Sequence, residues 1–351
     1  MATETEIAAM RRAVALSGSV GEATRPNPNV GAVVLDAAGA VVGEGRHERA
    51  GGPHAEVAAL AEAGGRARSG TVVVTLEPCD TTGRTGPCTQ ALLAAGVARV
   101  VFAVGDPTPA GGGAQRLAAA GVTVEGGVLA GEAEAANERW LLTVRRSRPF
   151  VVWKVAATLD GRVAAADGTS RWISGPASRE DTHRLRAECD TVVAGVGTVL
   201  ADDPHLTVRD AHGRVTGEQP LRVVVDSRGR TPTGARVLDA AAPTWVATAD
   251  ELGRGLHGGV DLDALLGALW AKERRLVLLE GGPTLAGGFL RAGLVDRVVA
   301  YVAPMLLGAG VPALAGTGVA TLADHVPLEI TEVHRLGPDV RLTARPVPKE
   351  D

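Results

Sequence analysis

Along the first 147 residues, apolar positions alternate between helical spacing and short strand-like runs. Apolar residues from Ile7 to Val14 recur at helical spacing, and the Gly18 that follows predicts the end of a first helix. The pattern then predicts a hairpin of strands at 30–36 and 41–45, strands at 71–77 and 97–105, and helices at 54–64, 89–96 and 131–146. Such alternation is typical of a layered α/β domain.

A second series of elements follows a polar, proline-containing stretch at 147–150. It predicts buried strands at 150–161, 190–196, 221–227, 242–248, 274–282 and 296–304, and helices at 178–188, 262–273 and 283–293. We place the boundary in this polar stretch, which gives domains 1–147 and 148–351. The chain shows no internal repeat, so we expect two α/β domains of different fold.

Composition and charge narrow the class of protein. The 351 residues suit two domains, and 45% hydrophobic with 22% charged residues is typical of a globular protein. With no apolar stretch as long as a membrane span and no secretory signal, we expect a cytoplasmic protein without membrane contact. A net charge of -4 and no basic cluster with aromatics argue against nucleic acid. Three cysteines argue against a disulfide framework.

One histidine and two cysteines of the first half carry the strongest chemical signal. His54 and Glu56 open a predicted helix, and Cys79 ends a predicted strand nine residues before Cys88. An imidazole and two thiolates suit tetrahedral Zn²⁺, and a fourth position without a protein ligand is typical of a catalytic site. Glu56 is then free to move a proton between water and a departing amine. The pattern predicts a zinc-dependent deaminase.

Each of these residues has a simpler interpretation when it is taken alone. A histidine often packs against or caps a helix, and a free cysteine often behaves as a small core residue. We interpret Cys189, in the second half, as such a core residue. Because the histidine, the glutamate and both cysteines of the first half occur together, we favour the catalytic interpretation for them.

The surrounding motifs resemble one family, the bifunctional riboflavin-biosynthesis deaminase/reductases. The similarity to its deaminase half lies in RPNPNVGAV at 25–33, GRHERAGGPHAE at 45–56 and LEPCDTTGRTGPC at 76–88. The resemblance implies a cytidine-deaminase-like three-layer fold, with Asn27, His47 and Arg84 contacting a pyrimidine substrate. Without it, Asn27 reads as a turn residue and His47 as a solvated or core histidine. The chain departs from the family at Asp80-Thr81, where Ser-His is more common, and in DPTPAGGGAQ at 106–115.

The second half resembles the reductase half of the same family, which has a dihydrofolate-reductase-like fold. The similarity lies in KVAATLDGRVA at 154–164, SRWISG at 170–175, GVGTVLADDPHLTVR at 195–209 and LEGGPTLAGGFL at 279–290. Glycines at 195, 197, 281 and 282 follow strands and precede helices, where backbone N–H groups can approach a phosphate. Taken singly they are as well explained by turns, because the full GxGxxG pattern is absent.

The resemblance implies a role for each of these positions. NADPH would be bound by Ala156, Trp172, Thr198, Asp202, Ser227, Gly282, Pro283, Thr284, Leu285, Ala286, Gly287 and Gly288. The ribosyl phosphate substrate would be bound by Ser170, Arg186, Leu206, Arg209 and Glu280, with Lys154 near the reacting sugar. Lys154 lies in an apolar strand, and a buried lysine is costly unless paired. Asp202 is a candidate acid, although Asp202 and Asp203 also read as a pair that ends a helix.

Ser227 and a neighbouring arginine, Arg228 or Arg230, are expected to bind the phosphate that distinguishes NADPH from NADH. The sequence thus predicts an enzyme that deaminates a pyrimidine ribosyl phosphate and reduces its ribosyl group to ribityl, with Zn²⁺ and NADPH, as a homo-oligomer. Two alternatives stay open: a base or nucleoside deaminase with an unrelated second domain, and a zinc-stabilised binding protein without activity. Binding of NADPH would argue against the first alternative, and enzymatic turnover would argue against the second.

Overall fold

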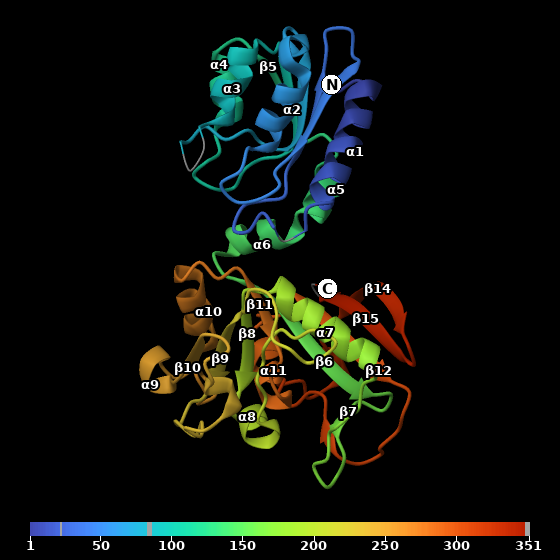
Figure 1. Ribbon diagram of the computed structural model, residues 1–351, viewed down its shortest axis with the longest axis vertical. Coiled ribbons are helices and arrows are strands. Elements are labelled where there is room, and N and C mark those ends of the chain that lie inside the picture. The colour runs from blue at the N-terminus through green and yellow to red at the C-terminus, as the bar shows by residue number, and fades with distance from the viewer. Residues whose placement is uncertain (22, 83–85, 348–351) are drawn as a thin grey trace. The chain divides into compact units, whose positions relative to one another are not determined.

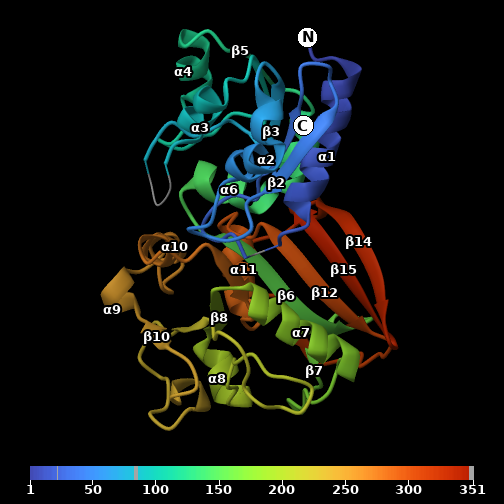
Figure 2. The ribbon, with the colours of Figure 1, turned by 45° about the horizontal axis from the view of Figure 1, so that its top comes forward.

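The computed structural model describes residues 1–21, 23–82 and 86–347. The chain folds into two compact units, Met1–Ser147 and Arg148–Asp351 (Figures 1 and 2). No helix in the described ranges is both long and apolar enough to cross a bilayer. Arg84, which the resemblance assigns to the substrate, lies outside the described residues.

The first unit is built on a five-stranded sheet in the order β2-β1-β3-β4-β5. β1 pairs antiparallel with β2 and β3, whereas β3, β4 and β5 are parallel. Its strands are β1 Gly31–Leu35, β2 Val41–Arg46, β3 Thr71–Leu76, β4 Arg99–Val104 and β5 Thr123–Gly126. Its helices are α1 Glu4–Gly18, α2 Ala55–Ala63, α3 Cys88–Ala95, α4 Gly113–Ala119, α5 Ala130–Ala136 and α6 Glu138–Arg146, with a 3-10 turn η1 at Gly64–Ala67.

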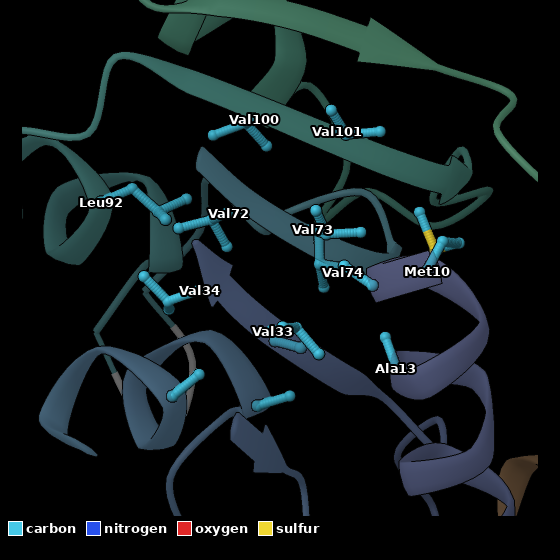
Figure 3. Packing of buried hydrophobic residues seen from close by; sticks show 14 of the residues in the cluster. Met10, Ala13, Val33, Val34, Val72, Val73, Val74, Leu92, Val100 and Val101 are labelled. Atoms are coloured by element: carbon cyan, nitrogen blue, oxygen red, sulfur yellow. The ribbon is translucent and has the colours of Figure 1, made fainter. Parts of the chain in front are cut away.

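Helices cover both faces of this sheet, and alternate strand residues point to them. Met10 and Ala13 of α1 lie beside Val33 and Val73, whereas Leu92 of α3 lies on the other side (Figure 3). All five side chains are fully buried. A β-strand turns successive side chains to opposite faces, so continuous valine runs supply both layers of core. The result is a three-layer α/β unit.

Gly45 of β2 lets the helix that carries His54 and Glu56 lie directly on the sheet. A Cβ atom at position 45 would stand 2.2 Å from the carbonyl oxygen of Ala55, the first residue of α2. Only a glycine permits this approach, because real Cβ contacts of that length do not occur. The strand therefore fixes the position of the first turn of α2.

The second unit contains an eight-stranded sheet in the order β10-β9-β8-β11-β6-β12-β15-β14. All neighbours from β10 to β12 are parallel, and β15 pairs antiparallel with β12 and β14. Its strands are β6 Phe150–Thr158, β8 Thr191–Gly195, β9 Leu221–Val225, β10 Thr244–Ala247, β11 Leu276–Leu279, β12 Arg297–Ala303, β14 Leu328–Leu336 and β15 Asp339–Pro346. A separate pair joins β7 Arg162–Ala164 to β13 Val311–Pro312.

The helices of the second unit are α7 Pro176–Glu188, α8 Val196–Asp202, α9 Ala249–Leu252, α10 Leu262–Ala271 and α11 Pro283–Arg291, with 3-10 turns η2 at Arg236–Leu238 and η3 at Leu322–Asp324. Leu266 of α10 and Phe289 of α11 pack in one core with Val151 and Val277 of the central strands. α7 lies against β11 and crosses the sheet in Figure 2. The mixed sheet with helices on it is the dihydrofolate-reductase-like arrangement that the motifs imply.

Three expectations about elements need correction. The single helix expected at 131–146 is broken at Asn137, which leaves the helical region at φ -122° and accepts a hydrogen bond from the Asn29 N–H. No element was assigned from the sequence to the glycine-rich segment after Asp106, which contains α4. The hairpin of β14 and β15 was not expected at all.

Candidate active sites

The three predicted metal ligands meet beyond the carboxyl end of β3, the central strand of the first sheet. Nδ1 of His54 lies 3.1 Å from Sγ of Cys88 and 3.6 Å from Sγ of Cys79. The ligand atoms all lie within 4.8 Å of one another. Tetrahedral zinc with Zn–N and Zn–S bonds of about 2.0 and 2.3 Å separates its ligand atoms by roughly 3.6 Å. One imidazole and two thiolates at this spacing fit a zinc ion with three protein ligands.

Their places in the fold explain why they converge. His54 is the N-cap of α2, Cys88 is the first residue of α3, and Cys79 follows β3. A hydrogen bond from Cys88 lowers the pKa of Cys79 to about 4, whereas the same interaction and burial raise the pKa of Cys88. Because zinc binds cysteine as the thiolate, binding of the metal would release any proton that the two thiols retain.

Glu56 points toward this cluster without belonging to it. It is the second residue of α2, is almost fully buried, and forms a hydrogen bond with Cys88. Burial raises its pKa from the usual glutamate value. A carboxyl group whose pKa lies closer to neutrality both accepts and returns a proton more readily, which suits a proton shuttle.

Asn27 and His47 form a pair beside the cluster. Nδ1 of His47 donates to the carbonyl oxygen of Pro53 at 2.9 Å, so the neutral ring leaves Nε2 as an acceptor for the Asn27 amide at 3.0 Å. The His47 ring also meets the His54 ring edge-on, with centroids 5.4 Å apart. The structure therefore brings both predicted substrate residues to the metal cluster, and His47 fixes the Asn27 amide.

Glu77 is a residue of this site that the sequence reasoning passed over. Its Oε1 accepts hydrogen bonds from the backbone N–H groups of Gly112 and Ala114 at 3.1 and 3.0 Å, and its Oε2 from that of Asp106 at 3.2 Å. It thereby attaches the 106–114 segment to the strand end that carries Cys79. The signal was available, because Glu77 belongs to the LEPC motif, but only the cysteine of that motif suggested chemistry.

The second unit contains a cavity of about 1340 Å³ at the carboxyl ends of its parallel strands. Ligands of open α/β sheets bind at this edge. Most of the predicted reductase residues line it: Lys154, Ala156, Ser170, Trp172, Arg186, Thr198, Asp202, Leu206, Arg209, Ser227, Glu280, Gly282, Pro283, Thr284, Leu285 and Gly288. Because these residues come from separate segments of the chain, their convergence is a property of the fold.

Lys154, Arg186 and Glu280 form a charged group in this cavity. Arg186 donates from Nε and Nη2 to the two oxygens of Glu280, at 2.5 and 2.9 Å, and from Nη1 to the carbonyl of Thr207. Nζ of Lys154 lies 4.0 Å from the same carboxylate and 5.7 Å from the centre of the Tyr301 ring. Burial lowers the pKa of Lys154. These contacts use three of the five N–H groups of Arg186.

Asp202 is the last residue of α8 and closes one side of the cavity. Its Oδ1 accepts a hydrogen bond from the Ser170 hydroxyl at 3.3 Å, and its carbonyl oxygen accepts one from Arg171 at 2.6 Å. The neighbouring Trp172 is two-thirds exposed, and the Arg179 guanidinium lies 4.5 Å from its ring centre. A flat, exposed aromatic surface at a cavity is suited to stacking against a ligand ring.

Three predicted positions do not line the cavity. Ala286 is fully buried in the core, and Gly287 packs against Ala315, since a Cβ there would stand 1.8 Å from the Ala315 carbonyl oxygen. Both belong to the inner side of α11, which turns away from the cavity. Arg228 is exposed outside the lining, whereas Arg230 lines it together with Ser227.

His183 lines the same cavity and was not singled out from the sequence. Its Nδ1 accepts a hydrogen bond from the Arg209 backbone N–H at 3.2 Å, so its hydrogen resides on Nε2. Burial and the charge of Arg186 lower its pKa, which keeps the ring neutral. It precedes Arg186 by one helical turn on α7, and that spacing was the available signal.

Two protein families match the chain, one within each compact unit. The family described as "Cytidine and deoxycytidylate deaminase zinc-binding region" matches residues 3–104, and the "RibD C-terminal domain" family matches residues 149–342. Riboflavin biosynthesis protein RibD of Mycobacterium tuberculosis is 49% identical over 337 residues, which cover 95% of this chain and 96% of the relative. The RibD protein of Escherichia coli is 42% identical over 357 residues, covering 95% and 97%.

Solved structures of two relatives superpose on nearly the whole of this chain. RibD of Acinetobacter baumannii superposes with a TM-score of 0.83 at 37% identity, covering 98% of this chain and 99% of its own. A Thermotoga maritima protein described as a diaminohydroxyphosphoribosylaminopyrimidine deaminase/5-amino-6-(5-phosphoribosylamino)uracil reductase gives 0.80 at 32%, with the same coverage.

The deaminase family covers the unit with the His-Cys-Cys cluster, and the reductase family covers the unit with the large cavity. The molecule is therefore a bifunctional enzyme that joins a zinc-dependent deaminase to an NADPH-dependent reductase. Since relatives up to 49% identical match it over nearly their full length, the chain belongs to the RibD family of riboflavin biosynthesis.

Proposed function

We propose that residues 1–147 deaminate a diamino-ribosylamino-pyrimidinone 5′-phosphate, and that residues 148–351 reduce the ribosyl group of the product to ribityl. The observation that carries the proposal is the presence of both sites in one chain: a three-ligand metal cluster beside the buried Glu56, and a cavity with Lys154 between Glu280 and Tyr301. The two activities in the name of the Thermotoga maritima relative support the same two reactions.

In the deaminase, His54, Cys79 and Cys88 would hold the zinc ion. When bound in such an open site, zinc lowers the pKa of water to about 7. The water oxygen forms a bond to the ring carbon, the bond from that carbon to the amino nitrogen breaks, and ammonia leaves. Glu56 takes the proton from the water and delivers it to the departing nitrogen. Asn27, fixed by His47, and Arg84 would orient the pyrimidine.

In the reductase, NADPH when bound would supply the hydride that C1′ of the sugar receives. Conversion of ribosyl to ribityl also breaks the bond from C1′ to O4′, so O4′ must receive a proton. We assign that proton to Lys154, whose lowered pKa makes its ammonium a better acid. Glu280, which is itself fixed by Arg186, would hold Lys154 in place. Arg209, Ser170 and Leu206 would contact the substrate.

The NADPH molecule would occupy the remainder of the same cavity. Asp202, Thr198 and the start of α11 at Gly282 lie along its wall. Pro283 has no N–H, but the other residues of the first turn of α11 have backbone N–H groups suited to a phosphate. Trp172 and Ala156 would flank the nicotinamide. Ser227 with Arg230 would bind the additional phosphate, because Arg230 lines the cavity and Arg228 does not.

One assay tests the two activities together. Purified protein is incubated with the pyrimidine substrate with and without NADPH, and ammonia release and NADPH oxidation are followed. We expect one ammonia without NADPH, and NADPH oxidation after deamination when both are present. Ammonia release with no NADPH binding would instead support a deaminase joined to an unrelated domain. The absence of both reactions would support a binding protein.

We also propose that the chain forms a homo-oligomer through the edge strand β14. Leu328, Ile330 and Val333 share one face of this strand. A bulge between Ile330 and Glu332 inserts one extra residue, so Val333 rather than Glu332 follows Ile330 on that face. All three are exposed, although alternation of apolar and polar residues is typical of a strand with one buried face. A second copy of the same strand offers the matching surface, as in a two-fold interface.

Light scattering on the purified protein tests this proposal. Replacing Ile330 and Val333 by glutamate should lower the measured mass to that of the single chain, whereas His334→Glu, next to Val333 in sequence but on the opposite face, should leave it unchanged. A single-chain mass for the unaltered protein would contradict the proposal. The cytoplasmic location remains a prediction from the sequence.

A further inference from the structure

The two cysteines of the metal cluster are nine residues apart, and the structure ties their backbones together directly. The Cys88 N–H lies 3.4 Å from Sγ of Cys79 and donates to it, and the Thr89 N–H donates to the Cys79 carbonyl oxygen at 3.3 Å. The residues that follow each cysteine therefore lie side by side. Their side chains are in a position to strengthen or weaken the cluster.

These following residues, Asp80 and Thr89, form a short hydrogen bond. The Thr89 hydroxyl donates to Oδ1 of Asp80 at 2.7 Å, and Thr89 is fully buried. Oδ1 of Asp80 also lies 3.1 Å from Nε of Arg116, and the Asp80 N–H donates to the Ala110 carbonyl oxygen at 3.0 Å. One side-chain contact thus joins the segment of Cys79 to the segment of Cys88.

The Cys79 segment is held from a second side by α4. Glu77 binds the backbone N–H groups of Gly112 and Ala114. Gly113 lies so close to Pro78 that a Cβ there would stand 1.9 Å from the Pro78 carbonyl oxygen. The peptide that carries Cys79 is therefore fixed against α4, and the Asp80–Thr89 contact fixes the start of α3 to the same frame.

We propose that Asp80 and Thr89 are positioning residues for zinc, which hold the two thiolates at ligand spacing before the metal binds. The inference rests on the assignment of Cys79 and Cys88 as zinc ligands in the proposed deaminase. Closing the loop between the two cysteines costs conformational entropy. If the ligands are already ordered before zinc binds, less of the binding free energy is lost to that cost. Removal of residues that orient ligands typically weakens metal binding by about 10- to 100-fold.

The contributions of the two partners of Asp80 are unequal. Arg116 is about half exposed, and an exposed ion pair contributes little. The Thr89 hydroxyl is buried and has no access to water in place of the carboxylate. An asparagine at position 80 would still accept the Thr89 hydrogen bond, whereas an alanine would not. The position therefore requires an acceptor oxygen more than it requires a charge.

The test is the dissociation constant for zinc, measured by competition with a chromophoric chelator on the full-length protein. Thr89→Val and Asp80→Ala should each weaken zinc binding by about 10- to 100-fold. Because both remove the same hydrogen bond, the double variant should be no weaker than the poorer single variant. Thr89→Ser, Asp80→Asn and Arg116→Gln keep the contact and should stay within about threefold of the unaltered protein.

Zinc affinity separates positioning from general destabilisation, since a loss of stability common to the zinc-free and zinc-bound folds leaves the dissociation constant unchanged. Should Thr89→Val not fold, Asp80→Ala carries the test, because Asp80 is partly exposed and its truncation leaves no buried cavity. Unaltered zinc affinity in Asp80→Ala would overturn the proposal. Absence of zinc binding by the unaltered protein would overturn the proposed deaminase itself.

Discussion

Arg186 and Glu280 face each other through two parallel hydrogen bonds, from Nε to Oε1 and from Nη2 to Oε2. Both side chains are largely buried, and Lys154 approaches the same carboxylate. Burial by itself raises the pKa of Glu280, but the charges of Arg186 and Lys154 outweigh it and lower the pKa below the usual glutamate value. One carboxylate therefore compensates two buried cations at the centre of the reductase cavity.

The first prediction is that Glu280→Gln destabilises the second unit. Removing one partner of a buried ion pair leaves the other charges uncompensated and typically costs about 3–5 kcal/mol. The exposed pair of Glu329 and Arg345 provides the control, and Glu329→Gln should cost about 0–1 kcal/mol. Urea unfolding followed by tryptophan fluorescence measures the stability of both variants. The signal reports mainly on the second unit, because Trp140 is the one tryptophan before residue 148.

The stability difference between the unaltered protein and Glu280→Gln should also depend on pH. A carboxyl group whose pKa is lower in the folded than in the unfolded state stabilises the fold above its unfolded pKa, which is about 4.3 for glutamate. That contribution is lost as the pH falls through the folded pKa. The gap in stability between the unaltered protein and Glu280→Gln should thus be full at pH 7 and narrow below about pH 4. A gap that widened in acid would contradict the assigned charge state.

The case of Lys154 shows how far sequence reasoning reaches. A lysine in the apolar run at 150–158 predicts a buried charge that needs a partner. The fold supplies Glu280 from the end of β11, which pairs with β6 although it lies far from it in sequence. Local patterns reveal a need for compensation but not the tertiary contact that meets it. The zinc cluster was easier to predict from the sequence, because both cysteines, His54 and Glu56 lie in short motifs whose residue types suffice to indicate the chemistry.

The elements that the sequence did not reveal share a physical cause. α4 begins within a run of glycines at 111–113 that disfavours a helix, and N–H groups at its start are satisfied by Glu77, which follows β3. Every residue from Leu328 to Arg335 in β14 is exposed, so no burial pattern marks that strand within one chain. In both cases tertiary contacts, rather than local propensity, determine the structure.

The second prediction concerns cofactor choice. Arg230→Ala should reduce the preference for NADPH over NADH by about 10- to 100-fold, because a hydrogen bond to a charged group contributes about 1.5–3 kcal/mol. Arg228→Ala, two residues away and outside the cavity, is the matched control and should leave the preference unchanged. The ratio of kcat/KM for the two cofactors is the measurement. Equal ratios in both variants would remove Arg230 from the cofactor site.

The third prediction is that His47 acts on the substrate through Asn27. His47→Ala removes the acceptor that fixes the Asn27 amide, and a hydrogen bond of about 1 kcal/mol corresponds to roughly a fivefold rise in KM for deamination. Asn27→Ala should raise KM further, and adding His47→Ala to it should have little effect. Since His47 also contacts the His54 ring, zinc content must be measured in each variant. Additive effects of the two substitutions would show that His47 contacts the substrate by itself.

The last prediction separates the two chemistries of the chain. Glu56→Gln keeps the size and burial of the side chain but removes the group that accepts a proton from water and delivers it to the leaving amine. General acid–base catalysis contributes about 10²- to 10⁴-fold, and a group used for both transfers should lie at the upper end. Ammonia release should therefore fall by about 10⁴-fold. Zinc should remain bound, because Glu56 is not among the three ligands.

Glu62→Gln on the same helix is the matched control, since Glu62 is exposed and lies outside the cluster. It should deaminate at the normal rate. In both variants the reductase, supplied with the already deaminated substrate, should oxidise NADPH at the unaltered rate, because Lys154 and its partners belong to the other compact unit. Near-normal deamination by Glu56→Gln would remove Glu56 from the proton transfer. A loss of reduction in the same variant would mean that the two active sites do not work independently.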